Sequence, residues 1–236
     1  MPLPLSPAPD PSFGNFLPGA NAAALAHLRT LAMPGPPVYL WGPAGSGKTH
    51  LLQALRRQAL ADGKRAEMLG VDDGLPPEAA ADLPAEAATG AAADPASEAP
   101  ALWLIDDCDR LDGAAQARAF GFFVAGVGSS QVVAAGRVPP VDLPLREDLR
   151  TRLGWGLVFA LQPLADGERH AALRQEAARR GIALPDELAQ HLLTRFARDL
   201  KHLMGLLERL DRYALARSRP LTVPLLRQML QEDGRW

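Results

Sequence analysis

The spacing of apolar and polar positions along the chain divides it into two parts. Up to residue 163, short apolar runs that are typical of buried strands alternate with segments of helical periodicity. The expected strands are residues 38–41, 65–71, 101–105, 131–135 and 157–161. Because strands that alternate with helices assemble into parallel sheets, this part predicts an α/β fold in which helices flank a parallel sheet.

Beyond Pro163 the pattern is helical throughout. Four helices are expected there: one runs from Asp166 to a stop near Gly181, one is opened by Pro185, one spans residues 199–217, and a short one is capped by Thr222. The predicted organisation is therefore an α/β domain over residues 13–163, followed by a small all-α subdomain over residues 164–236.

Two segments show neither periodicity. Residues 1–12 are rich in proline, which fixes φ and removes backbone donors, so we expect an extended N-terminal tail. Residues 72–100 combine alanine with acidic residues and contain no Lys or Arg, a composition that predicts a solvated insertion in the α/β domain. Between the tail and the first strand, a helix is expected from Asn21, as its N-cap, to Ala32.

Composition and charge place the chain among ordinary soluble globular proteins. It has 236 residues, 47% of them hydrophobic, and no apolar run of the ~18 residues that span a bilayer. The N-terminus lacks a secretion signal and Cys108 is the single cysteine, so a cytoplasmic location without an internal disulfide is expected. A net charge of -2 argues against a broad nucleic-acid-binding surface and predicts weak or no direct DNA binding.

A glycine-rich segment directly after the first expected strand carries the strongest functional motif. Residues 42–49, Gly-Pro-Ala-Gly-Ser-Gly-Lys-Thr, fill every fixed position of the phosphate-loop pattern, in which backbone N–H groups wrap the phosphates. The helix that begins there adds its positive dipole end. The expected nucleotide-binding residues are Gly42, Gly45, Ser46, Gly47, Lys48, Thr49 and His50. Lys48 would hold β- and γ-phosphate oxygens of ADP or ATP, and Thr49 would ligate Mg²⁺.

Two carboxylates follow the apolar strand at residues 101–105. Asp106 would hold Mg²⁺ through water, and Asp107 would orient the attacking water, as in P-loop ATPases. A strand that ends in an acidic turn is the alternative interpretation of this pair. The phosphate loop upstream favours the catalytic interpretation.

Two arginine-containing segments that follow these motifs indicate a particular family of P-loop proteins. Thr-Arg-Leu-Gly-Trp-Gly at residues 151–156 and Arg-Asp-Leu at residues 198–200 resemble segments of the AAA+ module in the DnaA family of replication initiators. The resemblance covers about residues 13–232 and implies an AAA+ P-loop module with a helical lid subdomain. It extends to the Hda family of short regulators, which lack the C-terminal DNA-binding domain of DnaA. One short helix is expected after Pro220, which leaves no room for a helix-turn-helix unit.

The resemblance implies roles for residues outside the phosphate loop. Arg152 resembles the arginine finger that reaches the nucleotide of a neighbouring subunit. Arg198 resembles the sensor-2 arginine, which approaches the chain's own nucleotide from the lid. Leu17 and Pro18 lie in a segment that contacts adenine in this family, although a hydrophobic staple for the first helix is an equally good interpretation.

The start of the chain resembles the end of a sliding-clamp-binding peptide. Leu3, Pro4 and Leu5 match its apolar anchors, which a proline-preset segment can dock at low entropic cost. The glutamine that such a peptide carries is absent, because Met1 falls where the following leucine would be. A proline-rich tail without a partner is the alternative.

One departure from the family bears on activity. The strand end at residues 134–137, Ala-Ala-Gly-Arg, offers only alanine and glycine where a polar sensor-1 side chain is expected, so we predict weak intrinsic ATP hydrolysis. The resemblance implies a regulatory adaptor, tethered to the DNA-loaded β sliding clamp of DNA polymerase, that stimulates ATP hydrolysis by DnaA and negatively regulates replication initiation. A self-hydrolysing AAA+ ATPase, such as a helicase loader, is the alternative, and assembly into a homo-oligomer stays open.

Overall fold

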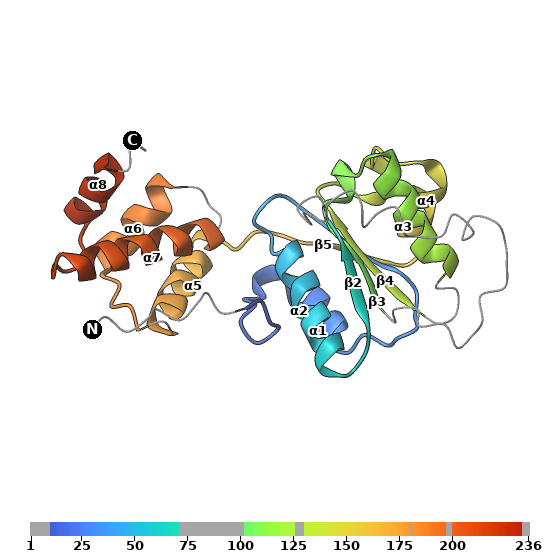
Figure 1. The fold of residues 1–236 in the computed structure, drawn as a ribbon, viewed down its shortest axis with the longest axis horizontal. Helices are drawn as coiled ribbons and strands as arrows, with labels where there is room; N and C mark the ends of the chain where they lie inside the picture. Colours follow the sequence, from blue (N-terminus) through green and yellow to red (C-terminus); the bar gives the residue numbers. More distant parts are fainter. Residues whose placement is uncertain (1–9, 71–101, 126–129, 180, 197–199, 233–236) are drawn as a thin grey trace. The chain divides into compact units, whose positions relative to one another are not determined.

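The computed structural model describes residues 10–70, 102–125, 130–179, 181–196 and 200–232 (Figure 1). The described part forms two compact units, which meet in sequence between Pro163 and Leu164. The predictions for most of the tail, for the insertion at residues 72–100 and for Arg198 fall outside the described residues.

The first unit contains a five-stranded parallel sheet in the order β2-β3-β4-β1-β5. Its strands are β1 (Val38–Trp41), β2 (Ala66–Leu69), β3 (Leu102–Ile105), β4 (Gln131–Gly136) and β5 (Leu157–Ala160). The predicted fold class, a parallel α/β sheet flanked by helices and followed by a helical region, is confirmed. Strand β1 lies between β4 and β5, so it is not an edge strand. The loop that follows β1 therefore has the end of another strand on each side.

The two faces of the sheet are covered by different helices, as the alternation of side chains in β1 shows (Figure 1). Val38 and Leu40 pack in the core with α1 (Ala22–Arg29) and α2 (Lys48–Ala61). Tyr39 packs in the opposite core with α3 (Gly113–Ala125) and α4 (Glu147–Gly154). Successive side chains of a strand point to opposite faces, so α2 and α4 lie on different sides of the sheet.

Helix α1 begins where predicted, with Asn21 at the N-cap position, but it ends earlier and its cap lacks the expected hydrogen bond. It ends at Arg29 rather than Ala32, since the prolines from Pro34 onward oppose helical structure in the segment that precedes β1. Asn21 closes a short 3-10 turn (Gly19–Asn21) and precedes α1, but its side chain makes no capping hydrogen bond. The predicted N-cap interaction is therefore wrong. The Asn21 side chain bonds to the backbone of Gln162 instead. Its Nδ2 donates to the Gln162 carbonyl oxygen, and its Oδ1 accepts from the Gln162 N–H, each at 2.8 Å.

The second unit is a helical bundle made of α5 (Asp166–Arg179), α6 (Asp186–Arg195), α7 (Leu200–Ala216) and α8 (Val223–Glu232). Its own core includes Leu173, Leu192, Leu207 and Leu226, each fully buried. The predicted cap at Thr222 is confirmed, since its Oγ1 accepts a hydrogen bond from the N–H of Leu225 at 3.3 Å.

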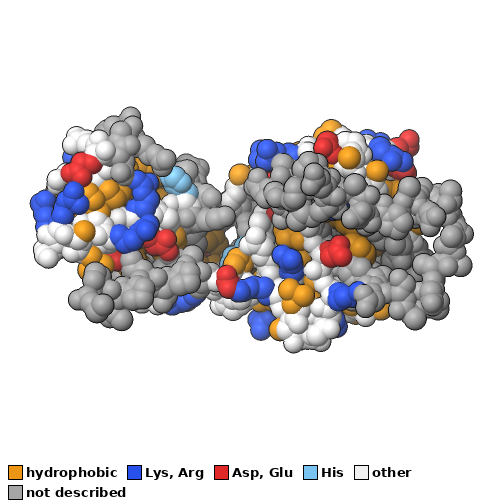
Figure 2. Space-filling view, in the orientation of Figure 1, with side chains coloured by type: hydrophobic (Ala, Val, Ile, Leu, Met, Phe, Trp, Pro, Cys, Tyr) orange, Lys and Arg blue, Asp and Glu red, His pale blue; other side chains and the backbone are white. Residues whose placement is uncertain are grey.

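The surface of the described residues carries mixed charge. On the face shown in Figure 2, acidic side chains lie among the basic ones on both units. This distribution fits the net charge of -2 and shows no single basic field on that face. None of the described helices is both long and apolar enough to cross a membrane.

Candidate nucleotide-binding site and arginine surface

The phosphate loop connects β1 to α2 in a conformation that requires glycine. Gly47 precedes α2 with a φ of 94°, in the left-handed region that L side chains rarely adopt. A Cβ at Gly47 would also stand only 2.6 Å from the ring of Phe16. At Gly42 a Cβ would collide with the carbonyl oxygen of Leu161. Neighbouring segments therefore approach the loop closely from both sides, which accounts for the glycines of the motif.

Lys48 begins α2 and turns its ammonium into the loop. Its Nζ donates to the carbonyl oxygens of Gly42 at 2.7 Å and Pro43 at 2.9 Å, and lies 3.4 Å from Ser46 Oγ. The side chain is buried, and this burial lowers the pKa of Lys48, while the charges of Asp106 and Asp107 partly restore it. The loop thus holds one cation at the end of β1, within the field of two carboxylates.

Asp106 and Thr49 lie together beside that cation. Burial raises the pKa of Asp106, and a hydrogen bond from the Thr49 side chain opposes the rise. The N–H of Asp107 also donates to Asp106 Oδ1 at 2.9 Å. A hydroxyl and a carboxylate are oxygen ligands of the kind that Mg²⁺ takes, with water and substrate phosphates completing its shell. No cluster of three or more His, Cys, Asp or Glu suited to a metal occurs among the described residues. The pair fits a Mg²⁺ that is bound together with nucleotide.

Asp107 adopts a left-handed backbone conformation with φ 47° and ψ 46°. Such a conformation is uncommon for residues other than glycine, and aspartate adopts it more readily than most. Its carboxylate lies 3.7 Å from the guanidinium of Arg110. The sharp turn after β3 keeps Asp107 next to Asp106 at the carboxyl edge of the sheet, where the phosphate loop also begins.

The segment that precedes α1 packs against the start of α2. The rings of Phe16 and His50 are 5.5 Å apart, and Nε2 of His50 lies 3.0 Å from the carbonyl oxygen of Ser12. Leu17 and Pro18, the predicted adenine contacts, follow Phe16 and are half-buried. Sequence reasoning missed Phe16 as the ring beside the loop. An aromatic residue in this short apolar segment was the available signal.

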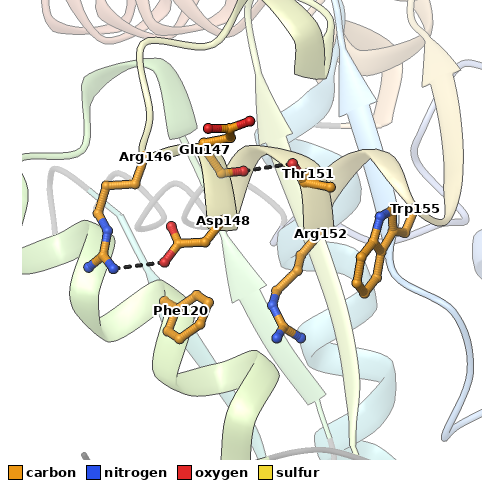
Figure 3. Close-up of a pocket in the computed structure, with 7 residues that line it drawn as sticks. All are labelled: Phe120, Arg146, Glu147, Asp148, Thr151, Arg152 and Trp155. Atoms are coloured by element: carbon orange, nitrogen blue, oxygen red, sulfur yellow. Dashed lines mark hydrogen bonds and ion pairs between the residues drawn. The ribbon is translucent and has the colours of Figure 1, made fainter.

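Arg152, the predicted arginine finger, lies on α4 beside a surface hollow (Figure 3). The hollow is lined by Phe120, Arg146, Glu147, Asp148, Thr151, Arg152 and Trp155. The Arg152 guanidinium is 5.1 Å from the ring centre of Phe120 and 5.5 Å from that of Trp155, distances suited to cation–π attraction. Trp155 itself is 70% exposed.

The site residues thus fall into two groups. The loop residues, Thr49, Asp106 and Asp107 gather at the carboxyl edge of the sheet, where β1 and β3 end. Arg152 belongs to α4, which packs in the opposite core through Leu149 and Leu153. Leu3, Pro4, Leu5 and Arg198 lie outside the described residues.

Two sequence families match the chain. The family described as the bacterial DnaA ATPase domain matches residues 8–160, and the one described as the Hda lid domain matches residues 166–230. The chain belongs to the DnaA-related AAA+ family. The resemblance that its motifs indicate is thereby confirmed at the level of the family.

Solved structures share the DnaA fold with this chain. Domain III of the Thermotoga maritima replication initiation protein DnaA has 23% identity and a TM-score of 0.74, covering 98% of both chains. AMPPCP-bound DnaA from Aquifex aeolicus has 22% identity and a TM-score of 0.65, with 88% of this chain and 66% of that chain covered. A mutant of Thermotoga maritima RuvB has 15% identity and a TM-score of 0.61, with 94% of this chain and 72% of that chain covered.

Proposed function

We propose that this protein is a regulatory AAA+ adaptor that binds a nucleotide at its phosphate loop and stimulates ATP hydrolysis by DnaA. Hydrolysis would inactivate the initiator, so the protein would negatively regulate replication initiation. The observation that carries the proposal is the position of Arg152. It lies at a surface hollow on α4, which packs in the core opposite α2, and this position supports a role toward a partner's nucleotide rather than toward the chain's own phosphate loop.

The nucleotide, ADP or ATP, would bind at the loop residues described above. The fit rests on Lys48, on the loop glycines with positive φ and on the Thr49–Asp106 pair. A bound Mg²⁺ would neutralise phosphate charge there, held by Thr49 directly and by Asp106 through water. DnaA from Aquifex aeolicus, which shares this fold, has been solved bound to the nucleotide AMPPCP.

Arg152 would act on ATP held by DnaA. Its guanidinium lies over two aromatic rings, which restrict its motion without neutralising its charge. A pre-positioned guanidinium stabilises the negative charge that develops on the γ-phosphate during transfer, a contribution of about 10³ to 10⁵ in rate. Docking would also bury the exposed Trp155 ring, and aromatic residues of this kind are common anchors of interfaces.

The tail residues Leu3, Pro4 and Leu5 would tether the protein to the sliding clamp. A tether raises the local concentration near DnaA on clamp-bearing DNA without adding a catalytic contact. We therefore expect the DNA-loaded clamp to promote the reaction and free clamp to substitute poorly.

The test is a reconstituted assay of ATP hydrolysis by DnaA in the presence of DNA-loaded clamp. Arg152→Ala should remove about 10³-fold or more of the stimulation, Lys48→Ala should remove nucleotide binding, and deletion of residues 1–6 should remove the clamp dependence. Arg150→Ala, on the same helix but outside the hollow, serves as the matched control and should behave as wild type. An unchanged rate of DnaA hydrolysis with all three variants would rule the adaptor out.

A self-hydrolysing ATPase, such as a helicase loader, is the second candidate. The observation in its favour is the Asp106–Asp107 pair beside Lys48, because P-loop ATPases use such carboxylates to hold Mg²⁺ and to orient the attacking water. Rapid hydrolysis by the purified protein alone, abolished by Asp107→Asn and unaffected by Arg152→Ala, would support this candidate against the adaptor.

A further inference from the structure

Residues 106–110, directly after β3, contain three carboxylates that meet different partners. Asp106 is the one proposed above to hold Mg²⁺ through water. Asp109 is tied to the chain just after β4, because its Oδ1 accepts a backbone N–H there at 3.0 Å. Asp107 is paired with a cation of its own turn, since its Oδ2 lies 3.7 Å from a guanidinium nitrogen of Arg110.

The backbone of this turn brings Asp107 and Arg110 together. Residues Cys108–Arg110 form the short 3-10 turn η4, and the N–H of Arg110 donates to the carbonyl oxygen of Asp107 at 2.8 Å. Residues three positions apart in a 3-10 turn lie one above the other. Cys108 and Leu111 are buried in the core with β3 and β4, which fixes the turn on the sheet. The pairing is therefore a product of local geometry.

Asp107 lies close enough to the phosphate site to influence its charges. Its carboxylate opposes the lowering of the pKa of Lys48 and adds to the raised pKa of Asp106. In hydrolysis, a water oxygen bonds to the γ-phosphorus, the bond from that phosphorus to the ADP oxygen breaks, and a water proton passes to the released phosphate. Asp107 would accept a hydrogen bond from that water, which requires a carboxylate that is free to turn toward it.

Arg110 competes with water for this carboxylate. A guanidinium donates hydrogen bonds and accepts none, so it attracts the carboxylate without being able to orient water as a base would. The pair is open to solvent, with 51% of the Arg110 side chain and 32% of the Asp107 side chain exposed. Because exposed ion pairs contribute little free energy, the restraint on Asp107 corresponds to a factor of about two to five.

We propose that Arg110 is a positioning residue, which holds the Asp107 carboxylate away from the attacking water and so slows the protein's own ATP hydrolysis. The proposal rests on nucleotide binding at the phosphate loop, as proposed above. The restraint comes from the same turn as the carboxylate, so it acts without a partner. The chain thereby retains its own nucleotide while Arg152 serves the ATP of another molecule.

The experiment measures ATP hydrolysis by the purified full chain at saturating ATP and Mg²⁺, together with ADP affinity by calorimetry. Arg110→Gln should raise kcat about two- to fivefold and leave the affinity within about twofold, because the residues that hold the phosphates are unchanged. Arg110→Lys keeps the charge and should stay close to wild type. Arg56→Gln, at an exposed position of α2, is the matched control and should change neither quantity.

A double variant separates positioning of Asp107 from a general effect on structure. Asp107→Asn should reduce hydrolysis, and Arg110→Gln should bring no gain in that background, because the carboxylate that Arg110 restrains is gone. Equal gains in both backgrounds would overturn the proposal. Arg110→Met provides a second neutral variant, with the same expected gain, should the glutamine variant fail to fold.

The outcomes separate this proposal from the one on which it rests. Lys48→Ala gives the background rate of the preparation. If wild type binds no nucleotide, nucleotide binding and the role of Arg110 are refuted together. If wild type binds ADP and Arg110→Gln hydrolyses ATP no faster than wild type, only the role of Arg110 is refuted. Stimulation of DnaA is a separate measurement, which Arg110→Gln should leave unchanged.

Discussion

Gly47 shows at a single residue how closely the nucleotide site is packed. Its φ of 94° and the nearby Phe16 ring both exclude a side chain. We expect Gly47→Ala to cost about 1–2 kcal/mol in backbone strain alone and to reduce nucleotide affinity, because the loop must shift to relieve the contact. Thermal unfolding and nucleotide titration measure the two effects.

The control for this change is Gly121→Ala. Gly121 lies within α3, and a Cβ there meets no atom within 4 Å. Alanine favours the helix over glycine by about 0.5–1 kcal/mol, so this variant should gain stability and keep its affinity. A Gly47→Ala protein that matches wild type in both measurements would contradict the described packing.

Asp106 provides a prediction of pH dependence. Burial raises the pKa of its carboxyl group in the folded protein. The folded state then binds this proton more tightly than the unfolded state does, so the free energy of unfolding declines as pH rises from the unfolded pKa through the raised folded pKa. Asp106→Asn removes this decline. The nucleotide-free variant should therefore melt higher than wild type at neutral pH, by a margin that shrinks toward acidic pH.

Titration of the melting temperature from acidic to neutral pH, without nucleotide or Mg²⁺, is the measurement. Asp142→Asn, which changes an exposed carboxylate on the same unit, is the matched control. A margin that grows toward acidic pH would mean that the sign is wrong.

Residues with a fixed motif were predictable from sequence, and residues defined by tertiary contacts were not. The glycines and Lys48 are recognisable because phosphate binding demands them at set spacings. Phe16 and Asp109 were missed because their neighbours, Gly47 and Arg137, are distant in sequence. Arg137 was visible in the sequence just after the end of β4, but its contact with Asp109 was not.

At the scale of elements, the bonds between Asn21 and Gln162 join the start of α1 to the chain just after β5. Asn21 is buried, so Asn21→Ala leaves the N–H and carbonyl of Gln162 without these partners. We expect a loss of about 1–3 kcal/mol in the free energy of unfolding of the α/β unit. Denaturant unfolding of the full chain, followed by the fluorescence of its tryptophans, measures it.

Asn15→Ala is the matched comparison. Asn15 also makes two hydrogen bonds, to Ser12 and Asp10, but Asn15 is only half-buried, so water can replace them more readily. Its substitution should cost less than that of Asn21. Equal losses would show that burial of the Asn21 amide carries no special weight.

Periodicity predicted the elements well and their ends less well. The five strands alternate with helices because short apolar runs and helical spacing differ strongly in pattern. The end of α1 was overestimated because apolar spacing continues to Ala32, while the prolines that follow oppose the helix. The role of Asn21 could not be predicted, because an asparagine just before a helix is compatible both with a capping hydrogen bond and with a contact to a residue distant in sequence.

At the scale of the whole molecule, the two units have separate cores. The helical unit buries Leu173, Leu192, Leu207 and Leu226 among its own side chains. We expect the fragment of residues 164–236 to fold alone, with a helical circular dichroism spectrum and a cooperative but modest thermal transition, because a unit of this size has little stability in reserve.

Leu207→Ala in that fragment tests whether the core is the cause. Truncating a fully buried leucine costs about 2–5 kcal/mol, enough to abolish the transition. Leu215→Ala, at an exposed leucine of the same helix, should leave it intact. A non-cooperative wild-type fragment would show that the unit depends on the rest of the chain.

Because α2 and α4 lie on different sides of the sheet, the nucleotide site and the Arg152 surface are two different surfaces of the α/β unit. A contact in which the Arg152 surface meets a neighbour's nucleotide site joins two unlike surfaces, so the same contact is not returned to the first molecule. Such head-to-tail joining leaves an unused arginine surface at one end and an unused nucleotide site at the other. If the protein meets DnaA through the proposed contact, its position at one end of such a row or at the other decides whether its Arg152 reaches a neighbour's nucleotide or a neighbour's arginine reaches its own.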